Sequence, residues 1–355
     1  MTERLPLEAQ TLYAELMEHL LAADVGQILG RLPGTFVVKR IKGAPYVYLQ
    51  VSMPGGSTRQ IYVGAQSRVL DRTIERFEGA RRDAAPDLQR EVRLAAQLRI
   101  SGVNTIDPPS ARVVRGLAAA GLFQAGGVLV GTHAFVALGN LLGVRWTGVG
   151  LRTQDVDIAT SAERDIDVAV PDLQTDVPSV LESLKMGFLP IPSLNPKQPS
   201  TSFKVRGQSL RVDLLCPGRG EDDPPVLIGR FRASAQPLRF LDYLLESPDK
   251  AVVLNGGVTL VNVPRPARFA LHKLIVAAVR PAAWQTKVEK DLAQAIALLE
   301  ILIEDRPGDV TLAWTDLAKR GPSWRKPFLA GLRAAKTRSP TLHDGLLALL
   351  PNATR

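Results

Sequence analysis

Hydrophobic and polar positions follow two different patterns in the first hundred residues. The segment LEAQTLYAELMEHLLAA (7–23) has apolar residues at helical spacing, which predicts an N-terminal helix. Residues 34–64 alternate with a period of two around two breaks rich in glycine and proline, which predicts a three-stranded meander. Residues 67–99 are charged and periodic with a break near Pro86, and they predict one or two exposed helices.

The pattern changes after Pro108-Pro109, which is the best candidate for a linker. Short apolar strands now alternate with short helices, and a loop with four prolines covers Leu189–Pro199. We expect strands at 127–131, 154–159, 166–170, 201–206 and 210–215, and helices at 110–120, 132–142 and 176–185. This alternation predicts the α/β class, with a mixed sheet of the α+β kind.

The last third is helical apart from its first residues. AVVLNGGVTLVNV (251–263) predicts a hairpin that turns at Asn255-Gly256-Gly257, and helices follow from Arg265 onward. Their expected breaks are Pro281, Pro307, Pro322 and Pro340. We therefore predict three units: a helix, meander and helical arm at 1–107, a mixed α/β domain at 108–263, and a helical domain at 264–355.

Composition narrows the class of protein. The chain has 355 residues, 45% of them hydrophobic, which is typical of a folded globular protein. Cys216 is the single cysteine, so an intramolecular disulfide and a cysteine-rich zinc site are excluded. The single cysteine and the absence of a leader pattern in MTERLPLEAQ together predict a cytoplasmic protein. The uncharged run Gly116–Val144 is long enough to span a bilayer, but its glycines indicate buried strands and helices instead.

Charge is unevenly distributed along the chain. Residues 1–100 carry a net +3, residues 101–229 a net −2 and residues 230–355 a net +8. An acidic middle third between basic flanks suits a cation held by carboxylates in the centre and a polyanion held by the flanks.

The candidate chemistry begins at a strand-to-helix turn. Gly131-Thr132 follows the apolar strand Val128–Val130 and opens a helix, so a phosphate could approach backbone N–H groups there, and Thr132 could cap the helix or offer its hydroxyl to the phosphate. Downstream, Asp155 and Asp157 face the same side of a strand while Val156 faces the core. Two adjacent carboxylates repel each other unless a cation lies between them, so the pair predicts Mg²⁺.

A third acid completes the constellation. Asp213 lies in the otherwise apolar strand LRVDLL, and a buried carboxylate there needs a partner. Three strand-borne acids near a helix N-terminus can form a two-metal site for phosphoryl transfer. A second pair, Asp165 and Asp167, has the same alternation and is an alternative metal pair, an additional rim of negative charge or a solvated strand end.

This order of motifs resembles the polymerase-β-like nucleotidyltransferase superfamily. GTHAF…LGVRW…RTQDVDIA and PARFALHKLIVAAVR…KVEKDLAQA are similar to an uncharacterised bacterial nucleotidyltransferase-like group, over residues 110–305. The resemblance implies a small mixed sheet backed by helices, a nucleoside triphosphate and two Mg²⁺ (or Mn²⁺) ions. It also implies attack of an acceptor on the α-phosphate with release of pyrophosphate.

The resemblance also assigns roles to residues. It implies that Asp155, Asp157 and Asp213 are catalytic and hold the metals, and that Asp213 helps to activate the acceptor. It implies that the nucleotide is held by Gly131, Thr132, Lys273 and, behind it, Lys290. This chain departs from the superfamily in having Gly-Thr where Gly-Ser is commoner, and in a longer gap before the acidic pair.

Two classes of function remain open at this stage. The first is an active nucleotidyltransferase whose acceptor is RNA or tRNA, with a protein hydroxyl or a small molecule as alternatives, and whose superfamily occurs in toxin and phage-defence systems. The second is a non-catalytic nucleic-acid-binding or regulatory module that keeps the fold. The meander's tyrosines (Tyr46, Tyr48, Tyr62) and its basic residues form either a nucleic-acid-binding face or merely the core of the meander.

Overall fold

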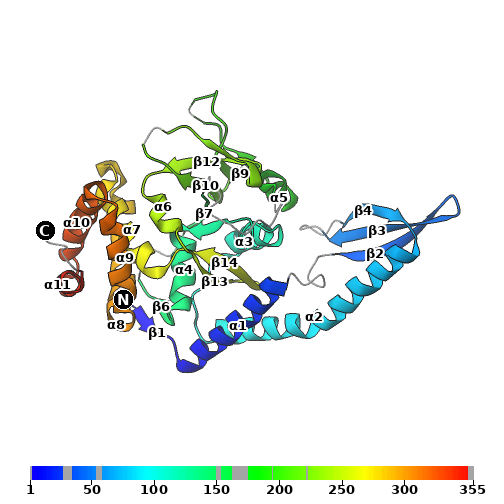
Figure 1. The fold of residues 1–355 in the computed structure, drawn as a ribbon, viewed down its shortest axis with the longest axis horizontal. Helices are drawn as coiled ribbons and strands as arrows, with labels where there is room; N and C mark the ends of the chain where they lie inside the picture. Colours follow the sequence, from blue (N-terminus) through cyan, green and yellow to red (C-terminus); the bar gives the residue numbers. More distant parts are fainter. Residues whose placement is uncertain are drawn as a thin grey trace.

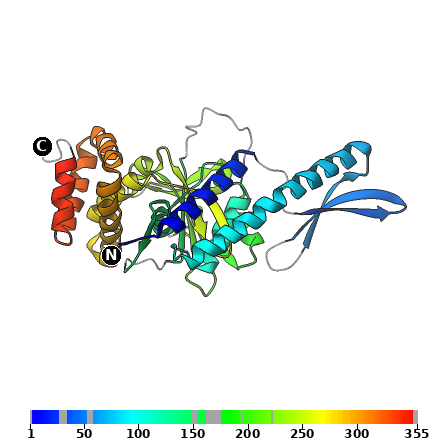
Figure 2. The same cartoon turned by 90° about the horizontal axis from the view of Figure 1, so that it is seen from below.

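The structure is a computed structural model. It describes residues 2–26, 34–52, 58–148, 153–161, 175–193, 195–220 and 223–350. A central α/β body carries helices on one side and, on the other, a long helix with a small sheet that projects away from the body (Figures 1 and 2). The α/β class and mixed sheet predicted from the sequence are confirmed.

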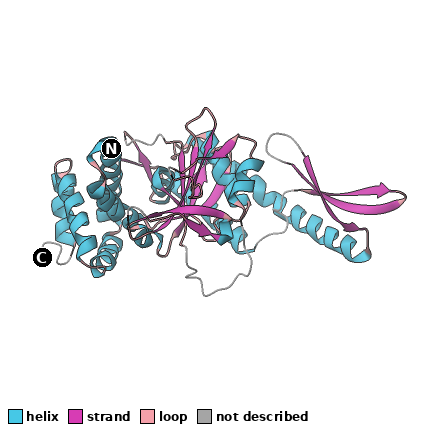
Figure 3. Ribbon diagram, turned by 90° about the horizontal axis from the view of Figure 1, so that it is seen from above, coloured by secondary structure: helices cyan, strands magenta, loops and turns pink. Residues whose placement is uncertain are grey.

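A mixed sheet forms the centre of the body (Figure 3). Its strands run in the order β11-β12-β10-β7-β5, and β9 joins β10 and β8. Strands β7 and β10 are parallel, whereas β5 pairs with β7 in antiparallel fashion. Their bounds are β5 Val128–Val130, β7 Asp155–Ala159, β8 Phe188–Pro190, β9 Ser202–Val205, β10 Arg211–Pro217, β11 Val226–Ile228 and β12 Ala233–Leu238.

Short helices and a hairpin pack around this sheet. The helical elements are α3 Pro108–Ala119, α4 Gly131–Leu141, α5 Val177–Ser183, the 3-10 turn η2 Gly229–Phe231 and α6 Leu241–Leu245. The predicted hairpin is formed by β13 Asp249–Leu254 and β14 Val258–Val263. The uncharged run Gly116–Val144 becomes the end of α3, β5, α4 and the start of β6, and in the part of the chain that is described no helix is long and apolar enough to cross a bilayer.

The C-terminal third is helical, as predicted. It contains α7 Pro266–Val279, the 3-10 turn η3 Ala282–Trp284, α8 Gln285–Asp305, α9 Pro307–Lys319, α10 Pro322–Lys336 and α11 Pro340–Leu349. Pro307, Pro322 and Pro340 each open a helix. Proline suits that first turn because its missing N–H would have had no partner within the helix.

The N-terminal elements join the body at its base. Helix α1 (Leu7–Gly26) packs against α2 (Arg68–Ile100), and the meander consists of β2 Thr35–Ile41, β3 Ala44–Ser52 and β4 Thr58–Ala65. Strand β1 (Thr2–Arg4) pairs with β6 (Val144–Trp146). The backbone N–H of Val252 in the hairpin also donates to the hydroxyl of Tyr13, so α1 is tied to the body.

Two breaks expected from proline are absent. Helix α2 continues through Pro86 without interruption. Tertiary contacts hold both of its halves: Phe77 packs edge-on against Phe36, and Leu94 and Leu98 lie in the apolar cluster with α1. These contacts outweigh the local cost of a proline inside a helix.

The other expected break, Pro108-Pro109, is the first turn of α3 rather than a linker loop. Asp107 caps this helix by accepting a hydrogen bond from the backbone N–H of Ser110. A proline pair fits both a loop and the first helical turn, and the capping carboxylate decides for the helix.

Several short elements were not predicted. Strands β1, β6, β8 and β11 have three residues each, too few to show a periodicity, and β12 contains Pro237. The strand predicted at 166–170 lies outside the described residues. Cys216 is free and fully buried on β10.

Candidate functional site

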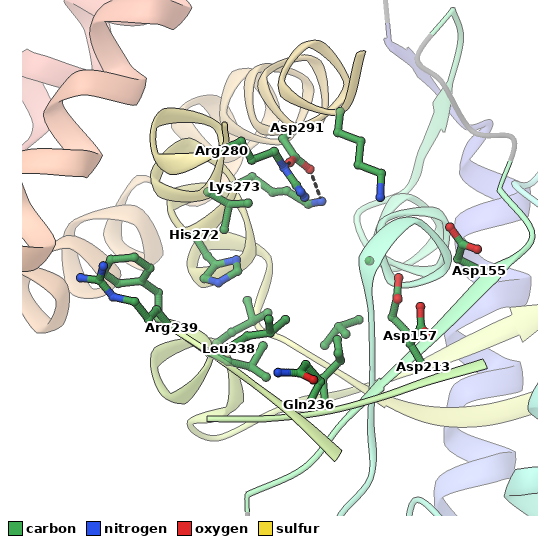
Figure 4. Close-up of a pocket in the computed structure, with 18 of the residues that line it drawn as sticks. Asp155, Asp157, Asp213, Gln236, Leu238, Arg239, His272, Lys273, Arg280 and Asp291 are labelled. Carbon is green, nitrogen blue, oxygen red and sulfur yellow. Dashed lines mark hydrogen bonds and ion pairs between the residues drawn. The ribbon is translucent and has the colours of Figure 1, made fainter. Parts of the chain in front are cut away.

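A cavity of about 700 Å³ opens between the central sheet and helices α7 and α8 (Figure 4). Every site residue predicted from the sequence lines it: Gly131, Thr132, Asp155, Asp157, Asp213, Lys273 and Lys290. The sheet contributes the acids and the helices contribute the lysines, so a ligand in this cavity lies between opposite charges.

The three acids meet on neighbouring parallel strands. Asp157 on β7 stands directly opposite Asp213 on β10, and Asp155 stands opposite Arg211. Side chains alternate along a strand, so Asp155 and Asp157 share the cavity face while Val156 is fully buried on the other. Figure 4 shows all three carboxylates directed toward the cavity.

The burial and close spacing of these carboxylates raise the pKa values of two of them. Burial, followed by the charges of Asp213 and Asp155, raises the pKa of Asp157 to about 7. Burial also raises the pKa of Asp213, although the Ser202 hydroxyl and the Arg211 guanidinium oppose the shift. The site therefore concentrates more negative charge than the protein alone neutralises, and a bound cation would relieve it.

Arg211 is a site residue that the sequence analysis missed. Its guanidinium lies 2.6 Å from Asp213 Oδ2 and 3.6 Å from Asp155 Oδ1. Arg211 thus acts as a counter-ion for Asp213 and Asp155. The three acids share the cavity, but among the described residues no group of three His, Cys, Asp or Glu side chains is close enough together to hold a metal ion as they stand. The spacing of Arg211, two residues from Asp213 on one strand, was the signal that could have placed it on the same face.

The Gly131 turn lies against the acids. Helix α4 begins at Gly131 itself, whose φ of +66° lies in the left-handed region that favours glycine. A Cβ at this position would stand 2.1 Å from Asp157 Oδ2. The turn and strand β7 are therefore in direct contact.

The predicted capping role of Thr132 is wrong. The residue before the helix is Val130, and no side chain caps this helix start. Because the helix begins at Gly131, Thr132 lies inside its first turn. Thr132 is buried and belongs to the cavity lining. The N–H groups of a first helical turn have no partners within the helix and suit an anion.

His133 holds the start of β7 in place. Its side chain is buried, with Nδ1 3.1 Å from the carbonyl oxygen of Asp155 and Nε2 3.7 Å from Asp107 Oδ2. Burial works against ionisation of Asp107, but its hydrogen bonds from His133 and Ser110 outweigh this and lower its pKa. His133 is thus a buried structural histidine that fixes the backbone of Asp155.

The basic side of the cavity is organised by Asp291. This buried carboxylate lies 2.5 Å from Lys273 Nζ and 2.7 Å from Arg280 Nε. Burial disfavours its charge, yet Lys273 and Arg280 more than compensate and lower its pKa. Burial, followed by the charge of Lys273, lowers the pKa of Lys290. In Figure 4, Lys273, Arg280 and Asp291 face the acids across the cavity.

The remaining part of the lining mixes apolar and polar groups with one arginine. Gln236, Leu238, Arg239 and His272 line it away from the acids (Figure 4). Burial, reinforced by Lys273, lowers the pKa of His272 to about 3, so its imidazole is neutral at physiological pH. This end suits a flat, uncharged ring with hydrogen-bonding edges.

Two further residues of the site, Ser202 and Asp291, were missed in the sequence analysis. Ser202, which donates a hydrogen bond to Asp213, and the organising role of Asp291 were not predicted. Both come from elements whose pairing only the fold reveals, β9 beside β10 and α8 beside α7. The alternative pair, Asp165 and Asp167, lies outside the described residues.

Comparison with known proteins identifies the family. A family model described as nucleotidyltransferase matches residues 109–319, which is more than half of the chain. This chain belongs to the nucleotidyltransferase family. The matched span of the nucleotidyltransferase contains every predicted site residue, from Gly131 to Lys290.

No curated protein matches the chain. The chain is similar to a solved structure, the antigenic nucleotidyltransferase-like protein from Paracoccidioides brasiliensis, with 13% sequence identity and a TM-score of 0.37; the match covers 70% of this chain and 97% of that one.

Proposed function

We propose that this nucleotidyltransferase transfers a nucleoside monophosphate from a nucleoside triphosphate to an acceptor hydroxyl and releases pyrophosphate. The observation that carries the proposal is one cavity in which Asp155, Asp157 and Asp213 face Lys273 (Figure 4). Lys290 lines the same cavity. Its two charged sides match a metal-bound triphosphate better than they match a neutral ligand.

The acids fit divalent cations. Asp155, Asp157 and Asp213 would hold Mg²⁺ or Mn²⁺, hard ions that prefer carboxylate oxygens. The raised pKa of Asp157 supports the fit, because burial and two neighbouring carboxylates leave its charge uncompensated. When bound, the ions would neutralise phosphate charge and acidify the acceptor hydroxyl. Arg211 would then exchange its contact with Asp155 for solvent or phosphate.

The phosphates would be held from two directions. On the sheet side, Gly131 and Thr132 line the cavity and would offer backbone N–H groups and a hydroxyl. On the helical side, Lys273 offers a compact positive charge, with Lys290 beside it. Asp291 keeps Lys273 in place, so little side-chain entropy is lost when the triphosphate arrives.

Asp213 would orient the acceptor hydroxyl and take its proton. The proposal is supported by its raised pKa, which burial causes, and by its two hydrogen-bond partners, Ser202 and Arg211. These partners fix the carboxylate in one orientation, which general-base catalysis requires. The nucleobase would occupy the end lined by Gln236, Leu238 and His272.

An anionic acceptor, RNA or tRNA, is favoured by the net charge of +9. A cytoplasmic setting, as predicted from the single cysteine, would supply both nucleoside triphosphates and RNA. A protein hydroxyl and a small molecule are the alternatives that the experiment must separate.

Label transfer tests the proposed function. The purified chain is incubated with each α-phosphate-labelled triphosphate, Mg²⁺ or Mn²⁺, and cellular RNA or protein, beside the double variant Asp155→Asn/Asp157→Asn. We expect label on a macromolecule with the wild type alone, which also identifies the base and the acceptor class. If the folded wild type transfers no label but binds RNA, the chain is a non-catalytic binding module and the proposal is rejected.

A further inference from the structure

The projecting meander exposes a face rich in aromatic rings. Tyr62 on β4 lies between Tyr46 and Tyr48 of β3, with ring centroids 6.1 and 5.5 Å apart. On β2, Lys39 Nζ lies 5.4 Å from the centre of the Tyr48 ring and also bonds Gln60. We call the surface formed by Lys39, Tyr46, Tyr48, Gln50, Gln60 and Tyr62 the tyrosine face.

This face points away from the helix that supports the meander. Phe36 contacts Phe77 of α2, with ring centroids 5.0 Å apart. Side chains alternate along β2, so its neighbour Val37, and the Tyr48 opposite Val37, lie on the other side of the sheet. The tyrosines are therefore not the core of the meander. That core is formed on the opposite side, where Val47 is fully buried.

The tyrosine face is accessible and its surroundings are basic. Tyr62, on the edge strand β4, is 56% exposed. No acidic residue occurs between Asp24 and Asp71. Among the basic residues of this stretch, Lys39 lies on the tyrosine face and Lys42 in the turn between β2 and β3, whereas Arg40 and Arg59 alternate to the opposite face.

We propose that the tyrosine face binds a single-stranded nucleic acid and so holds the acceptor of the proposed transfer reaction, on which this inference rests. Every base has a π-face that stacks on an exposed aromatic ring, which makes such binding tolerant of sequence. The amides of Gln50 and Gln60, joined to each other at 2.8 Å, supply donors and acceptors beside the rings. Lys39 on this face and Lys42 in the adjacent turn attract the phosphates.

Charge complementarity favours a nucleic acid over a protein partner. Exposed aliphatic residues also occur on the meander, among them Val38, Ile61 and Val63, and a second copy of the chain could cover them. However, Val38 and Ile61 pair with Val47 and Leu49 and so belong to the face opposite the tyrosines. Two copies that met at the tyrosine face would bring two wholly basic stretches together, which costs free energy.

The placement of the meander suits a long acceptor. Strands β2, β3 and β4 lie at one end of the molecule and helices α10 and α11 lie at the other (Figures 1 and 2). A strand held at the meander could extend toward the body while its end enters the cavity. The basic C-terminal helices are the competing place for the acceptor, and they provide a matched control.

Fluorescence anisotropy with the full chain tests the inference. The probes are labelled single-stranded RNA and DNA of about 16 nucleotides and a duplex RNA of equal length. The variant of the tyrosine face is Tyr48→Ala/Tyr62→Ala, and its conservative counterpart is Tyr48→Phe/Tyr62→Phe. The control is Arg333→Ala/Lys336→Ala, on the exposed side of α10. Circular dichroism and size-exclusion chromatography with light scattering report folding and oligomeric state.

We expect the alanine variant to bind single strands at least about tenfold more weakly, and the phenylalanine variant to bind about as tightly as the wild type, because stacking needs only the ring. The α10 control should retain most of its affinity. RNA bound more tightly than DNA would identify an RNA acceptor, and equal affinities would extend the acceptor to both.

Unchanged affinity of the folded alanine variant would overturn the inference. So would a change of oligomeric state without a change of affinity, which would make the tyrosine face a contact between copies. The binding assay contains no triphosphate or metal, so it is independent of turnover. A wild type that binds strands but transfers no label would refute the proposed function alone.

Discussion

Gly131 and Asp157 are so close that the protein leaves no room for a side chain between them. A Cβ at Gly131 would stand 2.1 Å from Asp157 Oδ2, well inside van der Waals contact. Val130, which precedes the glycine, also pairs with Asp157 across the sheet. The Gly131 turn and Asp157 are therefore one rigid unit, and a change in either position must be transmitted to the other.

Replacing Gly131 by alanine tests this unit. The added methyl group must displace the Asp157 carboxylate, so we expect nucleotidyl transfer to fall about 100-fold, the effect of a misplacement of roughly 1 Å. The positive φ also costs about 1–2 kcal/mol of stability. Gly207→Ala is the matched control, since its φ is +72° but nothing lies within 4 Å of the new methyl group. Equal activity of the two variants would contradict the prediction.

Asp157→Asn should be more stable than the wild type at pH 8 without divalent ions. The folded state raises the pKa of Asp157 from 3.8 to about 7, so protonation favours folding and this contribution is lost as pH rises through 7. The asparagine avoids that loss, and we expect a gain of roughly 2–4 kcal/mol at pH 8 that shrinks toward pH 4. Thermal unfolding in EDTA measures it.

Comparison of the wild type with Asp157→Asn also tests whether Asp157 takes part in binding Mg²⁺. Mg²⁺ should raise the Tm of the wild type more than that of Asp157→Asn, because only the wild type offers the full set of carboxylates. The variant should also lose transfer activity. A variant that is less stable than the wild type at pH 8 would show that the carboxylate is not under electrostatic strain.

Lys273→Met removes a charge while keeping a linear side chain. We expect the KM for the triphosphate to rise about tenfold or more, with a smaller effect on kcat, because Lys273 is assigned to binding. Asp291 keeps its pair with Arg280, so the fold should persist. Steady-state kinetics measure the effect, and Lys319→Met, at an exposed surface pair, is the control. An unchanged KM would reject the role of Lys273.

His272→Phe should reduce the acid sensitivity of the fold. The buried imidazole has a folded pKa of about 3, below its ordinary value of 6.5, so its contribution to stability is present above pH 6.5 and is lost as pH falls toward 3. Between pH 7 and 4.5 the wild type should therefore lose roughly 2 kcal/mol more than the variant. Urea unfolding at both pH values measures this, and parallel losses would contradict it.

Much of the fold and of the candidate site could be predicted because the signals are local. A period of two in the meander, Gly-Thr after an apolar strand, and Asp-Val-Asp all depend on neighbouring residues, whose geometry the backbone sets. The α/β class followed from the order of such segments. Pro86 and Pro108 misled the prediction because a proline is compatible with more than one local structure, and contacts with distant residues decide among them.

The sequence by itself determined which chemical groups are present, and in which order, along this nucleotidyltransferase. Only the tertiary structure decided that Arg211 lies against two of the acids, that Asp291 organises the lysine side, and that the meander's tyrosines lie on the face turned away from its core. Each of these depends on which strands pair and which helices pack. Those pairings come from burying a shared apolar core, whose free energy is a property of the whole chain and not of any local motif.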